Sequence, residues 1–270
     1  MSELSTIQNT RKINTVDSLV LDFKRLGLEK GMNIIVHSSL SSIGYVSGGA
    51  VAVVQALMDV ITSDGTIVMP THTSDNSDPA LWENPPVPKE WWPIIRETMP
   101  AFHPFYTPTR GMGKIVEVFR TFPGVVRSNH PTVSFAAWGK HIDFITKDHP
   151  IDNPMGEASP LARFYELNGS ILLIGVGHDS NSSLHLAEYR QNKQVPIKES
   201  AAVEIQGKRA WVTFENIAYQ TELFDKIGAE FEESNPFVVK KIGNAEVKFI
   251  SQVKIVDFAV EWLNKHNTKT

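Results

Sequence analysis

The stretch SILLIGVGHDSNSSLHLAEYR, residues 170–190, carries the strongest fold signal in the chain. Residues 170–176 are its most apolar run, of the kind that forms a strand buried on both faces. Asn181 or Ser182 then provides an N-cap for a helix that we expect to continue to about Arg190. A buried strand that leads through glycines into a helix is typical of α/β proteins, which build their sites at the carboxyl ends of strands.

Strands and helices are expected to alternate outward from this unit. Apolar residues recur at helical spacing in some stretches and form short unbroken runs in others. The elements expected upstream are helix 15–26, strand 33–36, helix 50–61, strand 66–69, a short helix at 115–122, strand 133–137 and a helix from Ser159 to Gly169. This alternation predicts an α/β fold with a largely parallel central sheet.

The final third has the pattern of antiparallel strands. Apolar segments flank two short turns, residues 206–209 and 243–244, and each arrangement predicts a hairpin. Helices are expected at 221–233 and 252–265. We interpret the chain as one domain over residues 15–270, with an antiparallel C-terminal subregion and a loose polar segment at residues 1–14. Exposed hairpin edges could pair two copies in a homodimer.

Residues 74–109 form a long loop in this interpretation. The loop contains eight prolines and three tryptophans, and each proline removes an amide donor and fixes φ. A loop of this length inside a compact domain is often functional. It could form a wall of a substrate site or an aromatic flap packed on the surface.

Composition excludes several classes of function. The 270 residues contain no cysteine, which excludes disulfides, a cysteine nucleophile and thiolate metal sites. The net charge of −4 gives no general electrostatic support for binding nucleic acid. No apolar run approaches the length of about 20 residues that spans a bilayer, and the polar start has no signal-peptide core. We therefore expect a cytoplasmic protein that binds neither nucleic acid nor a membrane.

His185 and Glu188 are the sharpest candidates for catalysis. They are three residues apart, so a helix places both on one face. A carboxylate beside an imidazole can orient it as a base that deprotonates a nucleophile. The same spacing also occurs by chance as a solvated pair on a helix surface.

Two glycine-containing turns are candidates for anion binding. Residues 36–41 place His37 and several serines at a strand end, ahead of a helix that follows Gly48-Gly49. Residues 109–114 place Arg110 and Lys114 before another helix, which suits phosphate contact. Both stretches could equally be ordinary polar turns.

Thr73 follows the strand at 66–69, where its hydroxyl could donate to a developing oxyanion. Asp152 lies in a turn before a helix. No HExxH motif or closely spaced histidine pair occurs, so we expect no metal site.

Six segments together resemble the aminoglycoside 3-N-acetyltransferase family, also called the antibiotic N-acetyltransferase family. They occur in the order of that family and span nearly the whole chain. The segments are VHSSLSSIGYVSGG (36–49), DGTIVMPTHT (64–73), PTRGMGKIVEVFR (108–120), RSNHPTVSFAAWG (127–139), SPLARFYELNGSILLIGVG (159–177) and NSSLHLAEYR (181–190). The resemblance implies the three-layer α/β/α fold of that family, which differs from the GNAT fold. It also implies acetyl-CoA-dependent N-acetylation of position 3 of a 2-deoxystreptamine ring.

The resemblance also implies roles for individual residues. His185 resembles the general base and Glu188 its carboxylate support, while Asp152 is a further candidate for holding a catalytic group. Thr73 would face the thioester carbonyl. The residues implied along the path of CoA are His37, Ser38, Ser39, Leu40, Ser41, Thr73, Arg110, Gly111, Met112 and Lys114.

An aminoglycoside is a polycation, so its site should be acidic. The candidates for binding this acceptor are Asp75 in the long loop and Asp225 and Glu230 near the C-terminus, although carboxylate clusters are often only solvated surface. Three other functions stay open: acetylation of another small amine, binding of CoA without catalysis, and metal-dependent hydrolysis through His72, His130, His178 or His185.

Overall fold

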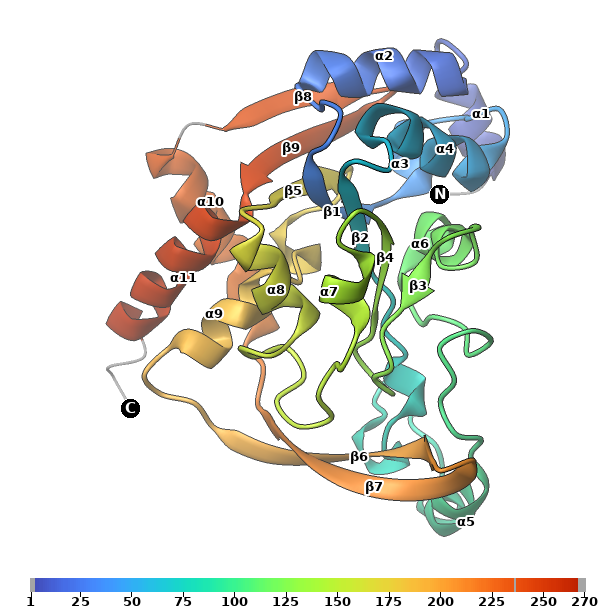
Figure 1. The fold of residues 1–270 in the computed structure, drawn as a ribbon, viewed down its shortest axis with the longest axis vertical. Helices are drawn as coiled ribbons and strands as arrows, with labels where there is room; N and C mark the ends of the chain where they lie inside the picture. The colour runs from blue at the N-terminus through green and yellow to red at the C-terminus, as the bar shows by residue number, and fades with distance from the viewer. Residues whose placement is uncertain (1–2, 236, 267–270) are drawn as a thin grey trace.

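The apolar run at 170–174 forms an inner strand of a seven-stranded sheet (Figure 1). The structure, a computed structural model, describes residues 3–235 and 237–266. The sheet order is β3-β4-β2-β1-β5-β9-β8. The strands are β1 (Asn33–Ser38), β2 (Thr66–Pro70), β3 (Val126–Arg127), β4 (Phe135–Gly139), β5 (Ser170–Ile174), β8 (Val238–Ile242) and β9 (Ala245–Ser251).

The parallel strands lie at the centre of the sheet. β1 pairs in parallel with β2 on one side and with β5 on the other. Beyond them, β4 and β3 continue one edge and β9 and β8 the other, each in antiparallel pairing. The predicted α/β class with an antiparallel C-terminal part is therefore confirmed, and the carboxyl ends of three parallel strands meet at one edge of the sheet.

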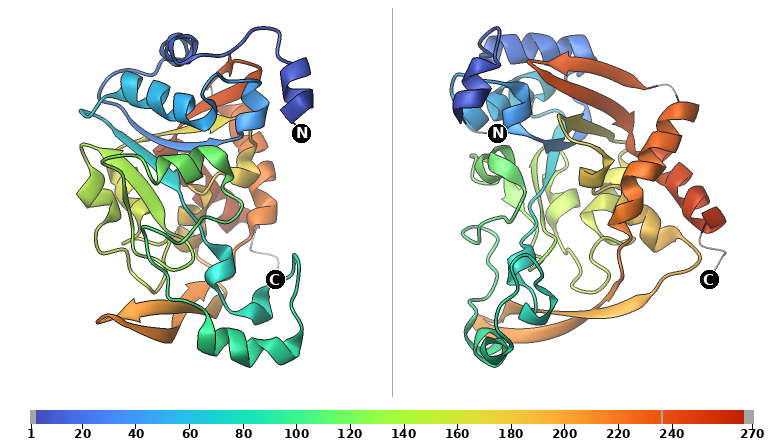
Figure 2. Two further views of the ribbon diagram at one scale, coloured as in Figure 1. Left: turned by 90° about the vertical axis from the view of Figure 1, so that its right-hand side faces the viewer. Right: turned by 180° about the vertical axis from the view of Figure 1, so that it is seen from behind.

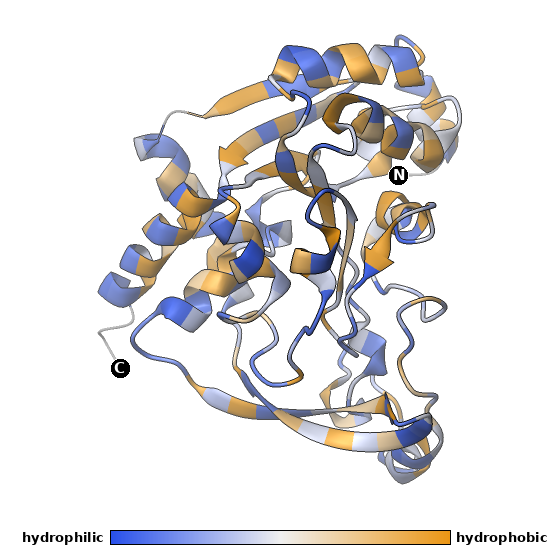
Figure 3. Cartoon of the chain, in the orientation of Figure 1, coloured by the Kyte–Doolittle hydropathy of each residue, from blue (hydrophilic) through white to orange (hydrophobic). Residues whose placement is uncertain are grey.

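Helices cover both faces of the sheet, which confirms the three layers. Consecutive residues of β1 belong to different cores, because Ile34 and Val36 pack on one face and Ile35 packs on the other. The strands are largely apolar, whereas the covering helices carry polar residues on their outer sides (Figure 3). The first face is covered by α2 (Val16–Leu26), α4 (Gly49–Ile61) and α6 (Gly113–Phe119), and the second by α7 (Ile142–Thr146), α8 (Pro160–Glu166), α9 (Leu184–Arg190), α10 (Phe224–Ser234) and α11 (Gln252–His266).

Both predicted hairpins form, but they pack differently. The second consists of β8 and β9, and β9 joins it to the main sheet. The first consists of β6 (Pro196–Ile205) and β7 (Lys208–Ile217), which form a separate two-stranded sheet. This sheet extends as a twisted ribbon at one end of the molecule, beside α5 (Trp92–Thr98), as Figure 2 shows. Pairing of such edges between two copies stays a prediction.

The long loop 74–109 packs against the first hairpin. It contains α5 and the short 3₁₀ helices η1 (Ser74–Asn76), η2 (Pro79–Leu81) and η3 (Lys89–Trp91). The amide of Phe102 donates to the carbonyl of Ala202 at 2.9 Å, and the side-chain amide of Asn76 also reaches this carbonyl at 3.4 Å. The loop therefore has defined anchors on β6.

Three local expectations differ from the structure. Residues 3–8 form a helix, α1 (Glu3–Gln8), although the polar segment was expected to be loose, and residues 1–2 lie outside the described residues. The helix after β5 begins only at Leu184, because η4 (His178–Ser180) takes up the preceding turn. The helix expected at 221–233 begins as η5 (Thr221–Leu223), before α10. The remaining short helix is α3 (Leu40–Ile43).

Candidate active site

A cavity of about 990 Å³ opens at the carboxyl ends of β1, β2 and β5. Its volume is at the upper end of the range of small-molecule sites, about 300–1,000 Å³. Residues from the ends of all three strands line it, together with the α6 N-terminus and the turn before α9. The lining includes His37, Ser38, Ser39, Leu40, Ser41, Pro70, His72, Gly111, Met112, Lys114, Asp179, His185 and Phe224.

The predicted His185–Glu188 pair forms at this cavity. His185 Nδ1 lies 2.6 Å from Glu188 Oε2, and the Glu188 side chain is fully buried. The second carboxylate oxygen accepts a hydrogen bond from the amide of Gln220. The pair is therefore an enclosed unit and not a solvated pair on a helix surface.

Aromatic side chains fix the orientation of the imidazole. The ring centroid of His185 lies 4.4 Å from that of Tyr219 and 5.0 Å from that of Phe224. With Nδ1 occupied by Glu188, the other ring nitrogen, Nε2, is the one available to a ligand in the cavity. The geometry suits a base that is held in one tautomer.

Two more histidines of the cavity are held neutral. Burial, and to a smaller extent the neighbouring histidines, lower the pKa of both His37 and His72 to about 3. Both rings are therefore neutral near pH 7 and can act as hydrogen-bonding groups, but not as cations.

Unpartnered polar atoms lie at the same place. His37 Nε2, Ser38 Oγ and His72 Nε2 are buried and have no hydrogen-bond partner within residues 3–235 and 237–266. A buried polar group left without a partner costs about 1–3 kcal/mol. Such atoms beside a large cavity indicate a ligand site, because a bound molecule can supply the missing partners.

Most of the residues predicted to contact CoA line the cavity. Ser39 and Ser41 lie within hydrogen-bond distance of each other at 3.2 Å. Arg110 does not line the cavity. Its guanidinium points to Asp75, 3.7 Å away, while its amide donates to the carbonyl of His72 at 2.9 Å. Those that line the cavity are His37, Ser38, Ser39, Leu40, Ser41, Gly111, Met112 and Lys114.

Thr73 and Asp152 are not brought to the cavity. The Thr73 hydroxyl is buried and donates to the carbonyl of Pro131 at 2.6 Å. Asp152 is exposed, and its carboxylate accepts from the amide of Glu215 at 2.8 Å. Each side chain serves a local structural contact, so neither placement supports the role that the sequence suggested.

The three predicted acidic residues are also dispersed. Asp75 faces Arg110, and Glu230 accepts from the Trp262 indole at 2.7 Å. Only Asp225 touches a lining residue, because its carboxylate accepts from the amide of Asp179 at 2.9 Å. Asp179 was not predicted as a site residue, although it lies in the segment 170–190.

His178 and His130, the other two histidines considered for metal-dependent hydrolysis, have partners of their own. His178 Nε2 lies 2.8 Å from Glu232, which also pairs with Lys248. His130 is fully buried and approaches the carbonyl of Ile151 at 3.2 Å. Within the described ranges, no three histidine, aspartate or glutamate side chains are close enough together to hold a metal ion. None of the helices in those ranges could span a membrane.

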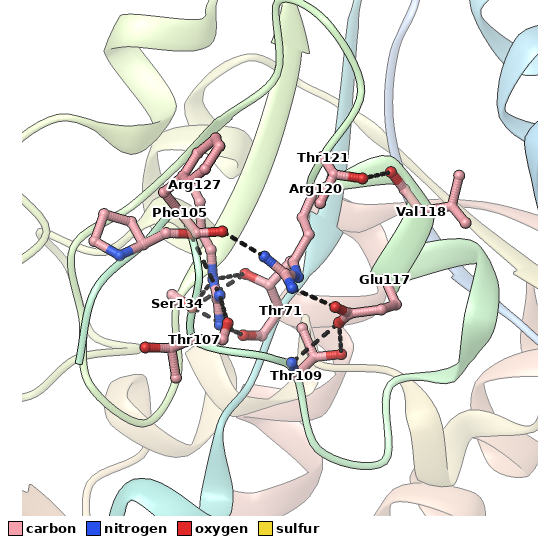
Figure 4. Close-up of polar contacts among 11 residues, drawn as sticks. Thr71, Phe105, Thr107, Thr109, Glu117, Val118, Arg120, Thr121, Arg127 and Ser134 are labelled. Carbon is pink, nitrogen blue, oxygen red and sulfur yellow. Dashed lines mark hydrogen bonds and ion pairs between the residues drawn. The ribbon is translucent and has the colours of Figure 1, made fainter. Parts of the chain in front are cut away.

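Arg127, the first residue of the quoted segment 127–139, is buried near the site, although the sequence suggested no individual role for it (Figure 4). Its guanidinium donates to the carbonyls of Thr71 and Thr107, each at 2.6 Å, and to the Ser134 hydroxyl at 2.9 Å. The cation also lies 5.0 Å from the centroid of the Phe102 ring. Burial lowers the pKa of Arg127 to about 10, so the guanidinium is still charged near pH 7. The oxygens that accept its hydrogen bonds are neutral and stabilise this buried charge. It fastens the end of the long loop to the end of β2.

A second clamp holds the same part of the loop (Figure 4). Glu117 accepts from the amide and the hydroxyl of Thr109, at 3.1 and 2.8 Å, and pairs with Arg120. Burial by itself would raise the pKa of Glu117, but the bonds to Arg120 and Thr109 lower it to about 2. Because Thr109 directly precedes the turn that lines the cavity, both clamps position that wall.

Replacing Arg127 with Met is expected to lower the free energy of unfolding by about 2–3 kcal/mol, because several buried oxygens lose their donor. Urea denaturation measures the change. The matched control is Arg11→Met, at an exposed arginine, which should change stability by less than about 0.5 kcal/mol. Equal stability of the two variants would contradict a supporting role for Arg127.

The sequence and the fold of this chain are similar to those of known proteins. The profile described as aminoglycoside 3-N-acetyltransferase matches residues 35–264. The SPbeta prophage-derived aminoglycoside N(3')-acetyltransferase-like protein YokD of Bacillus subtilis (strain 168) is 49% identical over 264 residues, which cover 97% of both chains. The crystal structure of YokD matches with a TM-score of 0.97 and 48% identity over 99% of both chains.

Two solved structures with bound ligands are also similar. AAC-IIIb, in a binary complex with CoASH, has a TM-score of 0.84 and 29% identity, covering 94% of this chain and 97% of its own. AAC-VIa bound to sisomicin has a TM-score of 0.84 and 28% identity, covering 94% of this chain and 98% of its own. The predicted fold, distinct from the GNAT fold, is confirmed.

Proposed function

The chain belongs to the aminoglycoside 3-N-acetyltransferase family, and we propose that it transfers the acetyl group of acetyl-CoA to the 3-amino group of a 2-deoxystreptamine aminoglycoside. The observation that carries this proposal is the buried His185–Glu188 pair at a large cavity where three parallel strands end. The CoASH bound to AAC-IIIb and the sisomicin bound to AAC-VIa support the two substrate classes.

The donor fits the composition of the cavity wall. The small hydroxyl side chains of Ser38, Ser39 and Ser41 can hydrogen-bond to the pantetheine chain. Lys114, in the first turn of α6, supplies a cation for the phosphates. The unpartnered polar atoms of His37 and Ser38 give this ligand further partners.

His185 performs the proton transfers in this proposal. Its Nε2 removes a proton from the acceptor ammonium group, and the amine lone pair then forms a C–N bond with the thioester carbon. The π electrons of the carbonyl move to oxygen and return as the C–S bond breaks. The attacking nitrogen, which still carries one proton too many after the C–N bond forms, loses it to water. The thiolate takes the proton from His185, so the products are a neutral amide, CoA as a thiol and one released proton, and the base is restored. Glu188 holds the imidazole in place through Nδ1.

The acceptor carries several positive charges, so we propose that Asp179 and Asp225 attract it at the rim of the cavity. Asp75 and Glu230 are occupied by Arg110 and Trp262, which makes them weaker candidates. We also propose a cytoplasmic location, because a chain without cysteine suits a reducing compartment.

The decisive experiment follows CoA release. The protein is incubated with acetyl-CoA and a panel of aminoglycosides, and free thiol is detected with a disulfide reagent. Since the chain contains no cysteine, the enzyme itself gives no signal. We expect thiol release that depends on the aminoglycoside and a product acetylated at position 3 by mass spectrometry.

Other results of the same experiment would support one of the other functions that the sequence left open. Release with a simple amine and with none of the aminoglycosides would contradict the proposed acceptor and support a different acetyltransferase. Binding of CoA by calorimetry, without release in the presence of any amine, would support a non-catalytic CoA-binding protein.

A further inference from the structure

The backbone conformation of the residues that follow β2 determines which of their side chains line the cavity. The amides of Thr71 and Thr73 both donate to carbonyls of the neighbouring antiparallel segment, those of Ser134 and Thr132, each at 2.8 Å. The chain is therefore extended here, and successive side chains point to opposite faces. Both threonine hydroxyls are turned away from the cavity, toward that segment.

His72 occupies the other face. Pro70 and His72 line the cavity, as the alternation requires, and His185 lines it too. Thr73, which the sequence suggested as the partner of the thioester carbonyl, therefore faces away from the cavity, and the preceding residue, His72, faces it. The side chain of the β2 extension that reaches the cavity is an imidazole and not a hydroxyl.

The imidazole of His72 is held in place, and its Nε2 has no hydrogen-bond partner among the described residues. Its ring meets Phe135 edge to face, with the centroids 5.3 Å apart and the planes at 82°. Its carbonyl accepts from the amide of Arg110, which fixes the backbone. Its Nε2 is buried and forms no hydrogen bond with the described part of the chain. Burial lowers the pKa of His72 to about 3, so the ring keeps a single proton near pH 7.

We propose that the neutral imidazole of His72 donates a hydrogen bond to the carbonyl oxygen of the acetyl thioester. This inference rests on the proposed function, because it assigns a residue to the acetyl-transfer step. As the C–N bond forms, the carbonyl oxygen becomes an oxyanion, and the N–H of His72 stabilises it without giving up its proton. When the carbonyl re-forms and the C–S bond breaks, the hydrogen bond weakens again. His185 moves the protons and His72 stabilises the charge.

A neutral donor suits this position. A second cationic imidazole beside His185 would oppose the positive charge that His185 acquires when it takes the proton. A neutral N–H stabilises the oxyanion and avoids that repulsion. The low pKa of His72, caused first by burial and then by His185 and other neighbours, favours this division of roles.

Two variants test the proposal. His72→Phe keeps a planar ring but has no donor, whereas His72→Gln keeps an N–H donor. We expect His72→Phe to lower kcat by about 100- to 1,000-fold, with the dissociation constant of CoA changed less than threefold. His72→Gln should recover part of kcat. The control is His141→Gln, remote from the cavity lining, which should behave as the unsubstituted protein. Circular dichroism and thermal melting verify that each variant is folded.

A spectroscopic measurement separates this inference from the proposed function. The infrared carbonyl band of 13C-labelled acetyl-CoA is recorded on the protein without any acceptor. The band should shift to lower frequency on binding, and His72→Phe should remove the shift while His72→Gln restores part of it. This result would support His72 even if no amine is acetylated.

Two results would overturn the inference. A folded His72→Phe variant with unchanged kcat and an unchanged carbonyl shift would remove His72 from the reaction while leaving acetyl transfer intact. If the protein binds no acetyl-CoA at all, the proposed function and the role of His72 both fail. Should His72→Phe not fold, His72→Leu replaces it as the variant without a donor, and the same two measurements, kcat and the carbonyl shift, decide in the same way.

Discussion

Replacing His185 with Ala is expected to reduce the rate of acetyl transfer by about 100- to 10,000-fold, the usual contribution of a positioned general base. The acceptor amine is protonated near neutral pH, and without His185 no group in the cavity is held in position to remove its proton. His37 and His72 line the same cavity, but burial lowers the pKa of each to about 3, so they are poor substitutes.

The binding of the donor distinguishes loss of the base from loss of the site. Calorimetry should give a dissociation constant for CoA within about threefold of that of the unsubstituted protein, while kcat falls. A second variant, Glu188→Gln, keeps the size of the side chain but weakens its hold on Nδ1, and it should lose activity less completely. A His185→Ala variant that keeps its full kcat would show that another group acts as the base.

The sequence was sufficient for features that depend on local spacing. His185 and Glu188 are three residues apart on a short helix, and this spacing alone brings their side chains together. The turn at residues 37–41 follows a strand whose apolar run is unmistakable, so its place at a strand end could be predicted. These elements need no knowledge of distant partners.

Features that depend on distant pairing were harder to predict. Thr73 and His72 are adjacent in sequence, and only the pairing of this segment with residues 132–134 decides which of them faces the cavity. Arg127 lies in a segment that the sequence marked, but its supporting role could not be predicted, because its acceptors are carbonyl and hydroxyl oxygens that become neighbours only in the folded chain. The carboxylates of Asp152 and Glu230 were engaged by partners that spacing could not reveal.

Lowering the pH from 7 to 5 is expected to remove about 6 kcal/mol from the free energy of unfolding, at about 2 kcal/mol for each of three histidines. Burial lowers the pKa of His37 and His72 to about 3 and that of His130 to about 4, from the ordinary value of 6.5. As the pH falls through 6.5, the unfolded chain binds protons that the folded chain cannot accept. Stability is therefore present above pH 6.5 and is progressively lost below it, down to the folded-state values.

The size of this effect follows from the same shifts. A pH of 5 lies about 1.5 units below the unfolded pKa of each histidine, and one unit corresponds to about 1.36 kcal/mol. A loss of about 6 kcal/mol is a large fraction of the stability of many domains, about 5–15 kcal/mol, so the folded protein should be much less stable at pH 5 than at pH 7. The pKa values of His149 and His178 are also lowered, mainly by burial, and act in the same direction.

Urea denaturation at pH 7, 6 and 5 measures this loss of stability. A substitution then shows how much of the loss comes from one histidine. His130 is fully buried outside the cavity lining, so His130→Gln removes one titrating group and should reduce the difference between pH 7 and pH 5 by about 2 kcal/mol. The carboxylate of Glu117, whose pKa is about 2, loses its contribution only below its unfolded value of 4.5, so it does not act in this window. Equal stability at pH 7 and pH 5 would show that the buried histidines accept protons in the folded protein.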